Sequence, residues 1–323
     1  MTKYLISGYI GFDNFGDEAI LKTLVTHLKT KNPEKITVIS SNPNKTKNLY
    51  NVETTGMFDF IKPVIETDVL ISGGGSLLQD ITSLKSLLYY LSIIMFSLVL
   101  NKKVVIFAQG FTPFRTKIGK FLTSFVLKKC HKIYVRDFES QKLLENLDIK
   151  STLVSDPVYA MEIKQAENKR GVGVQLRGFH TLDDKFLDNL ADSIAQNFAG
   201  ENIKLLSLQD KIDLPVLEKF SQKLKDRGID YTLFKNMTIE ETINTISSLE
   251  YLIGMRFHAN LIAAKAGVKI LGINYDIKVL TLAQSTGFPI IGFMEETFSK
   301  EFKSLIDLDA SKYNIPSFIF PEI

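Results

Sequence analysis

The residues best suited to chemistry in this sequence stand in the segment 254–260, GMRFHAN. Arg256 and His258 lie there between a strand-like apolar run and a helical pattern of small residues. A helix N-terminus attracts anions, because its first backbone N–H groups have no partner within the helix and its dipole is positive there. Arginine can hold a carboxylate or phosphate through two hydrogen bonds, and histidine can transfer a proton near neutral pH. The segment therefore predicts a site that handles an anion and moves a proton.

Three further cations stand at or just after the ends of other strand-like runs: Arg136, Arg177 and Lys278. A cation at the end of a buried strand is costly unless it pairs with a carboxylate such as Asp137, caps a carbonyl or meets an anionic ligand. For Arg136 and Arg177 these alternatives stay open. Because the carboxyl ends of parallel strands share one edge of a sheet, we expect cations from separate strands to converge there.

Two glycine-rich turns also connect a strand-like run to a helical pattern. In the first, residues 8–19, the candidate ligand contacts are Gly11, Asn14 and Asp17. In the second, residues 72–80, they are Gly73, Gly74, Gly75, Gln79 and Asp80. Glycines permit close approach to the backbone, whereas acidic residues at a helix start disfavour phosphate and suit a sugar hydroxyl. The turns are predicted to contact substrate, and the alternative is a purely structural turn.

Neither turn has the spacing of a nucleotide-binding motif. The first fails the G-x-G-x-x-G fingerprint of dinucleotide-binding proteins, and the second lacks the Lys-Ser/Thr of a P-loop. The sequence also has no G-x-S-x-G nucleophile motif and no His/Asp/Glu grouping at metal-ligand spacing. We therefore expect neither a metal nor a nicotinamide cofactor, and an oxidoreductase is the least favoured class.

The surrounding sequence alternates between apolar runs rich in Ile and Val and segments with helical spacing of apolar residues. This alternation predicts an α/β protein with parallel sheets covered by helices on both faces. A polar stretch with a proline turn, residues 155–170, predicts a linker. We expect two doubly wound, Rossmann-like domains facing a cleft, residues 1–160 and 161–323, with the last segment packing back on the first domain.

Composition narrows the class of protein further. The chain has 323 residues, and its 39 Lys and Arg against 36 Asp and Glu leave a formal net charge of +3, which is too balanced for a dedicated nucleic-acid binder. The single cysteine, Cys130, excludes an internal disulfide and is consistent with a reducing compartment. The first residues show no signal-peptide pattern. We expect a cytoplasmic protein.

The most lipid-like segment is residues 87–100, LLYYLSIIMFSLVL. It falls short of the roughly 20 residues that a membrane-spanning helix needs. A buried helix is the first interpretation. The alternative is a helix that touches a membrane surface, which its two tyrosines and the lysines on either side would permit; the protein would then be peripheral at the inner face of the plasma membrane.

Several segments that occur in order from about residue 4 to 280 resemble a known family. They are GYIGFDNFGDEAI, ISGGGSLLQDITSLKSLLYYL, FAQGFTPF, VRDFES, SDPVYA, GMRFHANLIAAKAGV and INYDIKV. Together they resemble the polysaccharide pyruvyl transferase family, most closely its CsaB-type bacterial branch. The resemblance implies a fold similar to GT-B glycosyltransferases. It also implies transfer of pyruvate from phosphoenolpyruvate to a sugar as a cyclic ketal, with release of phosphate.

The resemblance implies roles for the charged residues as well. The family motifs align Arg136, Arg256, His258 and Lys278 with catalysis on phosphoenolpyruvate: the arginines hold its carboxylate and phosphate, His258 acts as acid and base, and Lys278 neutralises developing charge. Arg177 and the glycine-rich turns would contact substrate, with the acceptor on the first domain. In the CsaB branch the acceptor is an N-acetylmannosamine residue of a lipid-linked cell-wall precursor. Phosphoenolpyruvate is a co-substrate, and the scheme requires no cofactor.

Two other functions stay open at this point. A glycosyltransferase that uses a nucleotide-sugar donor would share the architecture, and binding of UDP but not phosphoenolpyruvate would distinguish it. A non-catalytic α/β binding protein would bind the ligand without releasing phosphate.

Overall fold

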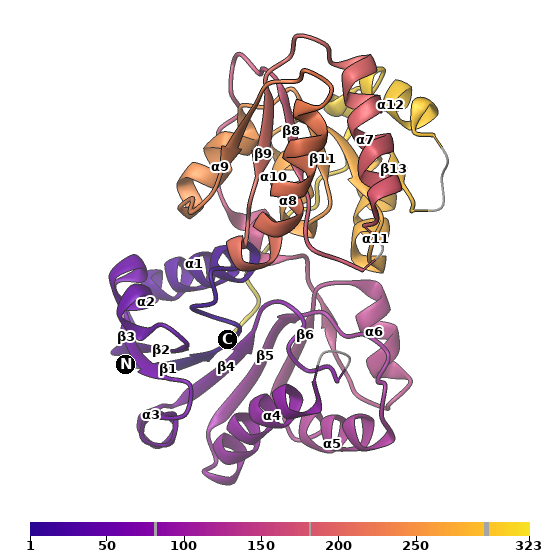
Figure 1. The fold of residues 1–323 in the computed structure, drawn as a ribbon. Coiled ribbons are helices and arrows are strands. Elements are labelled where there is room, and N and C mark those ends of the chain that lie inside the picture. Colours follow the sequence, from indigo (N-terminus) through magenta and orange to yellow (C-terminus); the bar gives the residue numbers. More distant parts are fainter. Residues whose placement is uncertain (81–82, 181, 294–296) are drawn as a thin grey trace. The chain divides into compact units, whose positions relative to one another are not determined.

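The computed structural model describes residues 1–80, 83–180, 182–293 and 297–323 and divides the chain into two compact units (Figure 1). Unit 1 comprises Met1–Met161 and Ser317–Ile323, and unit 2 comprises Glu162–Pro316. Each unit contains one parallel β-sheet whose strands are connected by helices. The predicted α/β fold class is confirmed.

Unit 1 is built around a seven-stranded sheet with the strand order β3-β2-β1-β4-β5-β6-β7. All neighbouring strands of this sheet are parallel, and in the register of β1 and β4 Leu5 pairs with Leu70. The chain reverses its direction of travel across the sheet between these two central strands, which is where ligands bind in folds of this kind. Its elements in chain order are β1 (Lys3–Ser7), α1 (Phe15–Thr30), β2 (Lys35–Ser40), α2 (Pro43–Tyr50), β3 (Glu53–Gly56), α3 (Ile61–Glu66), β4 (Val69–Gly73), α4 (Leu84–Val99), β5 (Lys103–Gln109), α5 (Lys117–Leu127), β6 (Lys132–Val135), α6 (Phe138–Glu145), β7 (Thr152–Leu153) and the 3-10 turn η1 (Pro157–Ala160).

Unit 2 repeats this arrangement with a six-stranded sheet in the order β10-β9-β8-β11-β12-β13. The equivalent reversal falls between β8 and β11, which pair directly. Its elements are β8 (Val172–Gln175), α7 (Asp184–Asn197), β9 (Ile203–Leu206), α8 (Asp210–Lys225), β10 (Tyr231–Phe234), α9 (Ile239–Ser247), β11 (Tyr251–Gly254), α10 (Phe257–Lys265), β12 (Lys269–Ile273), α11 (Ile277–Thr286), β13 (Ile290–Ile291), α12 (Ser299–Ile306) and the 3-10 turn η2 (Ala310–Lys312).

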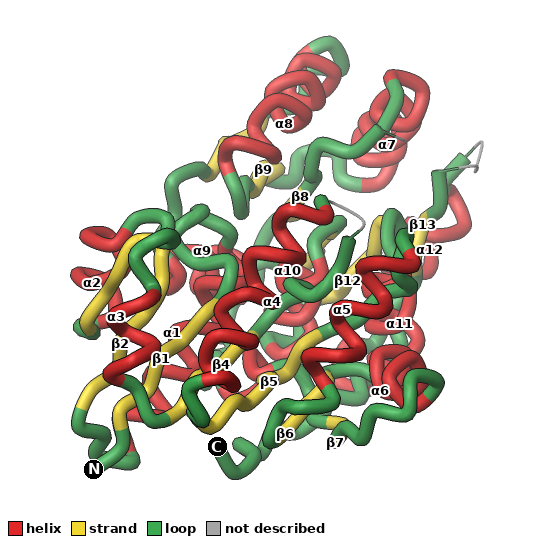
Figure 2. Tube along the Cα trace, turned by 90° about the horizontal axis from the view of Figure 1, so that it is seen from below, coloured by secondary structure: helices red, strands yellow, loops and turns green. Residues whose placement is uncertain are grey.

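Each unit has its own hydrophobic core, which explains why the strands appear in the sequence as continuous apolar runs. Leu70 and Val104 lie fully buried in unit 1, and Leu205 and Ile253 do so in unit 2. Strands covered on both faces need apolar side chains in both directions. In unit 1 the helices α3, α4 and α5 lie over one face of the sheet (Figure 2).

The last segment of the chain packs within unit 1. Phe320 stacks on the imidazole of His27, with ring centroids 3.7 Å apart, and also on Phe107 of β5. The hydroxyl of Tyr134 donates to the backbone carbonyl of Glu322 over 2.9 Å. These contacts hold the segment against the strands of unit 1.

The apolar segment 87–100 lies in α4 up to Val99, and Leu100 is the C-cap of this helix. One side of this helix is buried, including Leu87, Leu91 and Ile94, as the first interpretation predicted. Among the described residues, no helix combines the length and the apolar character that crossing a membrane requires.

Candidate functional site at the strand ends

Four of the predicted site residues follow the carboxyl ends of neighbouring strands in unit 2. Arg177 follows β8, and Arg256 follows β11 as the N-cap of α10. His258 lies in the first turn of α10, and Lys278 lies in the first turn of α11, after β12. These strands are adjacent in the sheet and parallel. The fold therefore places all four residues at one edge, around the point where strand order reverses.

Direct contacts tie these three strand ends together. The side-chain oxygen of Gln175, at the end of β8, accepts the backbone N–H of Arg256 over 2.7 Å. The backbone N–H of Arg177 approaches the sulfur of Met255 at 3.3 Å. The guanidinium of Arg177 donates to the hydroxyl of Tyr275, after β12, over 3.2 Å. The loops after β8, β11 and β12 thus form one connected site.

Arg256 forms a buried ion pair that the sequence did not predict. Its Nε and Nη2 bind both carboxylate oxygens of Asp213 in α8, over 2.9 Å and 2.6 Å, and Nη2 also donates to Gln209 over 3.1 Å. Asp213 is 0% exposed and accepts the backbone N–H of Leu208 as well. A buried charge needs such a partner, so Asp213 holds Arg256 in place and offsets its charge. No spacing in the sequence connects the two residues, which are 43 positions apart.

Arg177 differs from Arg256 in that its charge is not offset in this way. Among the residues that the structure describes, no carboxylate lies within ion-pair distance of Arg177, and its buried Nε has no hydrogen-bond partner. Its guanidinium also lies over the ring of Tyr275, 5.4 Å from the centroid. A buried N–H donor without a partner is costly. Arg177 is therefore the cation of this edge that an anionic ligand would satisfy best.

The N-terminus of α10 offers a second feature that favours an anion. Among the described residues, no side chain caps this N-terminus, and the first turn contains no acidic residue. His258 lies in this turn, against the ring of Phe257. A hydrogen bond connects this helix to the end of β11, because the side-chain amide of Asn260 donates to the carbonyl of Gly254 over 3.0 Å. A Cβ on Gly254 would collide with Asn260, so the glycine that ends β11 is required for this packing.

Arg136 of unit 1 is paired as Arg256 is. Its Nη1 lies 3.2 Å from Asp156, and both side chains are almost fully buried. Asp137 lies farther from the guanidinium, at 3.8 Å, and caps α6 by accepting the N–H of Ser140. Of the alternatives that the sequence left open, the structure shows the carboxylate pair, with Asp156 as the closer partner.

The first glycine-rich turn is held by an acidic residue of α1. Asn14 caps this helix, and its amide donates to Asp17 over 2.6 Å. The backbone N–H of Gly11, whose φ is 83°, donates to the carboxylate of Glu18 over 2.8 Å, and the hydroxyl of Tyr50 donates to the same group. Burial raises the pKa of Glu18. Sequence reasoning missed Glu18 as the residue that shapes this turn.

The triple glycine packs directly against α1. Gly74 and Gly75 both have a positive φ, near 78° and 74°. A Cβ on Gly74 would lie 2.6 Å from Ile20, and one on Gly75 would lie 2.6 Å from the carboxylate of Asp17. The structural alternative therefore accounts for these glycines, and the same packing brings the predicted contacts Asn14, Asp17 and Gly75 of the two turns side by side. Substrate contact at the turns stays a prediction.

Gln79 and Asp80 connect the second turn to the segment before α5. The amide oxygen of Gln79 accepts from the hydroxyl of Thr112 over 3.3 Å. Asp80 accepts the backbone N–H groups of Arg115 and Thr116, each over 2.7 Å. Burial acts to raise the pKa of Asp80, but the hydrogen bonds from Thr116 and Arg115 outweigh it and hold this pKa below its usual value. Asp80 is thus an ionised carboxylate that fixes the start of α5.

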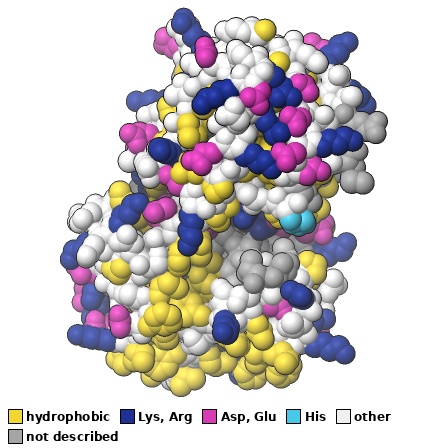
Figure 3. All heavy atoms as spheres, viewed as in Figure 1, with side chains coloured by type: hydrophobic (Ala, Val, Ile, Leu, Met, Phe, Trp, Pro, Cys, Tyr) yellow, Lys and Arg dark blue, Asp and Glu magenta, His cyan; other side chains and the backbone are white. Residues whose placement is uncertain are grey.

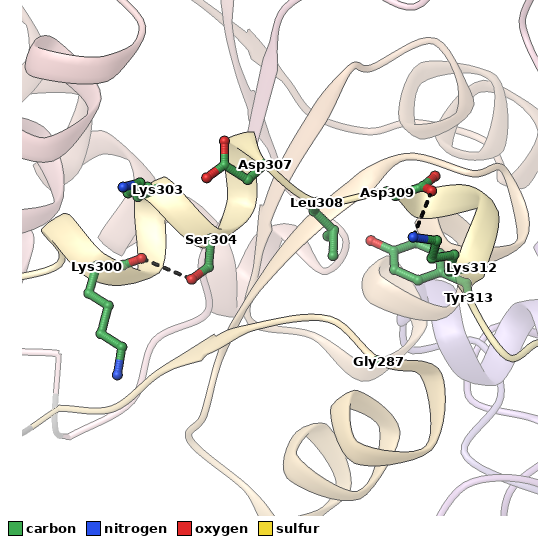
Figure 4. A pocket seen from close by; sticks show the side chains of 9 residues that line it. All are labelled: Gly287, Lys300, Lys303, Ser304, Asp307, Leu308, Asp309, Lys312 and Tyr313. Atoms are coloured by element: carbon green, nitrogen blue, oxygen red, sulfur yellow. Dashed lines mark hydrogen bonds and ion pairs between the residues drawn. The ribbon is translucent and has the colours of Figure 1, made fainter.

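A hollow of about 530 Å³ lies in unit 2 (Figure 4). It is formed where α11 ends, along α12 and beside η2. Lys300, Lys303 and Lys312 line it together with Asp307 and Asp309, and Lys312 pairs with Asp309 at 3.5 Å. None of the predicted site residues lines this hollow. Within the described ranges, no group of three His, Cys, Asp or Glu side chains is placed to hold a metal ion.

The two parallel sheets and their strand-end sites define an α/β protein with the GT-B fold. A structure of Anabaena HepE with UDP and glucose is 9% identical, with a TM-score of 0.63 over 97% of this chain and 91% of that one. The UDP-GlcNAc 2-epimerase of Methanocaldococcus jannaschii is 10% identical, with a TM-score of 0.66 over 98% and 95%. A glycosyltransferase of Rickettsia africae is 11% identical, with a TM-score of 0.63 over 96% and 90%. At such identities the likeness concerns the fold alone.

The sequence itself identifies the family. Residues 14–277 match the model of the family described as polysaccharide pyruvyl transferase. The chain therefore belongs to the polysaccharide pyruvyl transferase family, whose members are transferases. A search of curated protein sequences found no relative that matches.

Proposed function

We propose that this protein transfers the pyruvyl unit of phosphoenolpyruvate to a sugar as a cyclic ketal. The observation that carries the proposal, beside the family, is that the buried Nε of Arg177 has no hydrogen-bond partner, while the start of α10, with His258 in its first turn, has no side-chain cap. Phosphoenolpyruvate has a carboxylate and a phosphate at its reacting end. Binding it needs more than one cationic or N–H group at one place, which this strand edge supplies.

The donor would be held mainly by groups whose charge is not already matched. Arg177 would bind one anionic group, and the N–H groups at the start of α10 would bind the other. Arg256 would contribute through Nη1, because Asp213 and Gln209 engage its Nε and Nη2. Lys278 would neutralise the phosphate as it departs. Arg136, paired with Asp156, is the least available of the proposed catalytic cations and would shape the acceptor side.

His258 would act as the general base and general acid of the reaction. A first sugar hydroxyl adds to C2 of phosphoenolpyruvate while the methylene carbon gains a proton and becomes a methyl group. The C2–O bond to phosphate then breaks, and phosphate leaves with that bonding pair. A second hydroxyl of the same sugar attacks the resulting C2 cation and loses its proton, which closes the ketal. A histidine in the first turn of α10 can take up a hydroxyl proton and deliver a proton to carbon, as general base and acid.

The acceptor would bind the turns of unit 1, where Asp17, Gln79 and the backbone of the triple glycine are suited to hydroxyl groups rather than phosphate. We propose a lipid-linked cell-wall precursor with an N-acetylmannosamine residue, as in the CsaB-type branch, and a reaction in the cytoplasm. The scheme uses phosphoenolpyruvate as a co-substrate and routes no step through a metal or another cofactor.

The test is to incubate the protein with phosphoenolpyruvate and a panel of saccharide acceptors, including N-acetylmannosamine-containing disaccharides, and to follow phosphate release together with product mass. A product that gains one pyruvate ketal for each phosphate released supports the proposal. If no acceptor reacts, thermal unfolding with phosphoenolpyruvate or UDP separates the cases. Stabilisation by phosphoenolpyruvate keeps the donor and changes the acceptor, whereas stabilisation by UDP alone contradicts the proposal and favours a nucleotide-sugar glycosyltransferase.

A further inference from the structure

The helix α5 presents an apolar stripe to solvent. Ile118, Phe121 and Phe125 are 62%, 67% and 47% exposed. Their spacing of three and four residues puts them on one side of the helix, and the rings of Phe121 and Phe125 stack on each other. The opposite side is buried through Val126 and Leu127. An ordinary surface helix has polar residues on its outer side, so this stripe needs an explanation.

The apolar surface extends over the two neighbouring helices. The helix α4 packs against both α3 and α5, so the outer sides of the three helices adjoin. Figure 3 shows hydrophobic side chains gathered over this lower part of unit 1. The exposed residues on and beside α3 and α4 are Phe58, Ile61, Ile65, Leu88, Val99 and Leu100. We call these residues together with the α5 stripe the apolar face. A contiguous apolar surface of this kind marks an interaction site.

The charges around the apolar face have one sign on α4 and α5. The sequences of these two helices contain no Asp or Glu. Lys85, Lys117, Lys120 and Lys128 are exposed on them or at their ends. Lys129 is exposed too, and its Nζ lies 4.8 Å from the ring centroid of Phe125. Aromatic and aliphatic side chains flanked by lysines are typical of helices that lie in the surface of an anionic membrane.

We propose that the apolar face binds the surface of an anionic lipid bilayer. Ile118, Phe121 and Phe125 would enter the boundary between head groups and acyl chains, while the lysines would contact the lipid phosphates. A second copy of the chain fits less well, because a twofold contact through this face would bring the α5 lysines of both copies together. The binding would be peripheral. The outer side of α4 would then touch the membrane surface, as the alternative interpretation of residues 87–100 expects.

The experiment measures binding of the full chain to sedimenting lipid vesicles. One preparation contains phosphatidylcholine with phosphatidylglycerol, and the other contains phosphatidylcholine alone. We expect binding to the anionic vesicles that weakens with salt. F121S/F125S and K120E/K128E should each weaken it by about 10-fold or more.

Two matched variants control for the type of change. L49S removes an exposed apolar side chain from α2, and K185E/K235E reverses two exposed charges in unit 2. Both should bind vesicles as the unchanged protein does. Equal binding to both vesicle types, or equal losses in the control variants, would overturn the proposal. A dimer that F121S/F125S dissociates, without vesicle binding, would assign the face to a second copy instead.

This inference stands apart from the proposed reaction, because the vesicle assay contains neither donor nor acceptor. Turnover of a water-soluble acceptor by F121S/F125S should match that of the unchanged protein. If neither the unchanged protein nor any variant shows turnover while vesicle binding behaves as expected, the proposed reaction is wrong and the proposed membrane binding is supported.

Discussion

The strand ends of the two units share one topology and differ in charge. In unit 1 the reversal point lies beside α1, whose first turn contains Asp17 and Glu18. In unit 2 it lies beside α10, whose first turn contains no acidic residue and includes His258. The same strand order thus positions an edge suited to hydroxyl groups in one unit and an edge suited to an anion in the other.

The three arginines at these edges show why charge must be counted with its partners. Arg136 follows β6 and Arg256 follows β11, and each lies against a buried aspartate, Asp156 or Asp213. Arg177 has a tyrosine and a sulfur as neighbours, with no carboxylate within ion-pair distance in the described ranges. Two of the arginines are therefore matched by a buried carboxylate, and the third is not.

The largest effect should come from removing His258, the residue proposed to transfer protons. His258→Ala should lower kcat by about 100-fold or more, the usual contribution of general acid–base catalysis. Phosphate release under saturating phosphoenolpyruvate measures this. His131→Ala, at an exposed position of unit 1, is the control. Thermal unfolding of both variants should stay close to that of the unchanged protein; near-normal turnover in His258→Ala would remove the histidine from the mechanism.

The next effect concerns the buried pairs. Asp213→Asn leaves the Arg256 charge without its partner, and breaking such a pair costs about 3–5 kcal/mol of stability. Asp156→Asn removes the closer carboxylate from Arg136 in unit 1 and leaves Asp137 at 3.8 Å, so its effect should be smaller. Circular dichroism during heating should show a lowered Tm in both variants. Asp213→Asn should also lower turnover in preparations kept below that Tm, because Arg256 loses its orientation, whereas an unchanged Tm would show that the pair contributes little.

Much of the fold could be predicted from the sequence, because strands covered on both faces must be apolar in both directions. The runs that end at Arg136 and before Arg256 are examples. The positions of the residues that follow strands, such as Arg136 and Arg256, could be predicted because the apolar runs show where the strands end. Their partners could not be predicted. Asp213 reaches Arg256 only because the first turn of α8 lies at the end of β8, where Gln175 donates to Asp213, and Glu18 reaches Gly11 only because the turn folds back over α1. Such pairs depend on tertiary packing, which leaves no local spacing to detect.

A smaller effect should distinguish Arg177 from the paired arginines. Arg177→Ala should raise the KM for phosphoenolpyruvate by roughly 10- to 100-fold, the effect of losing a charge-assisted hydrogen bond of about 1.5–3 kcal/mol. Its Tm should hardly change, since no buried carboxylate is left unpaired. Arg170→Ala, an exposed position in unit 2, provides the control. A lowered Tm with an unchanged KM would instead make Arg177 structural and leave the anion to another group.

The smallest effect tests the acidic edge of unit 1 through pH. Burial raises the pKa of Glu18 above its usual value of 4.5. Between the unfolded and the raised folded pKa, the folded state binds more protons, so the contribution of Glu18 to stability falls as pH rises through that window. Glu18→Gln removes this titration, and its amide can still accept from Gly11 while donating to the hydroxyl of Tyr50. The Tm of the variant relative to the unchanged protein should therefore rise slightly as the pH is raised from 4.5 towards neutrality. A relative Tm that falls over this range would mean that the ionised carboxylate of Glu18 stabilises the turn. The strand edge of unit 1 would then present a negative charge to the proposed sugar acceptor.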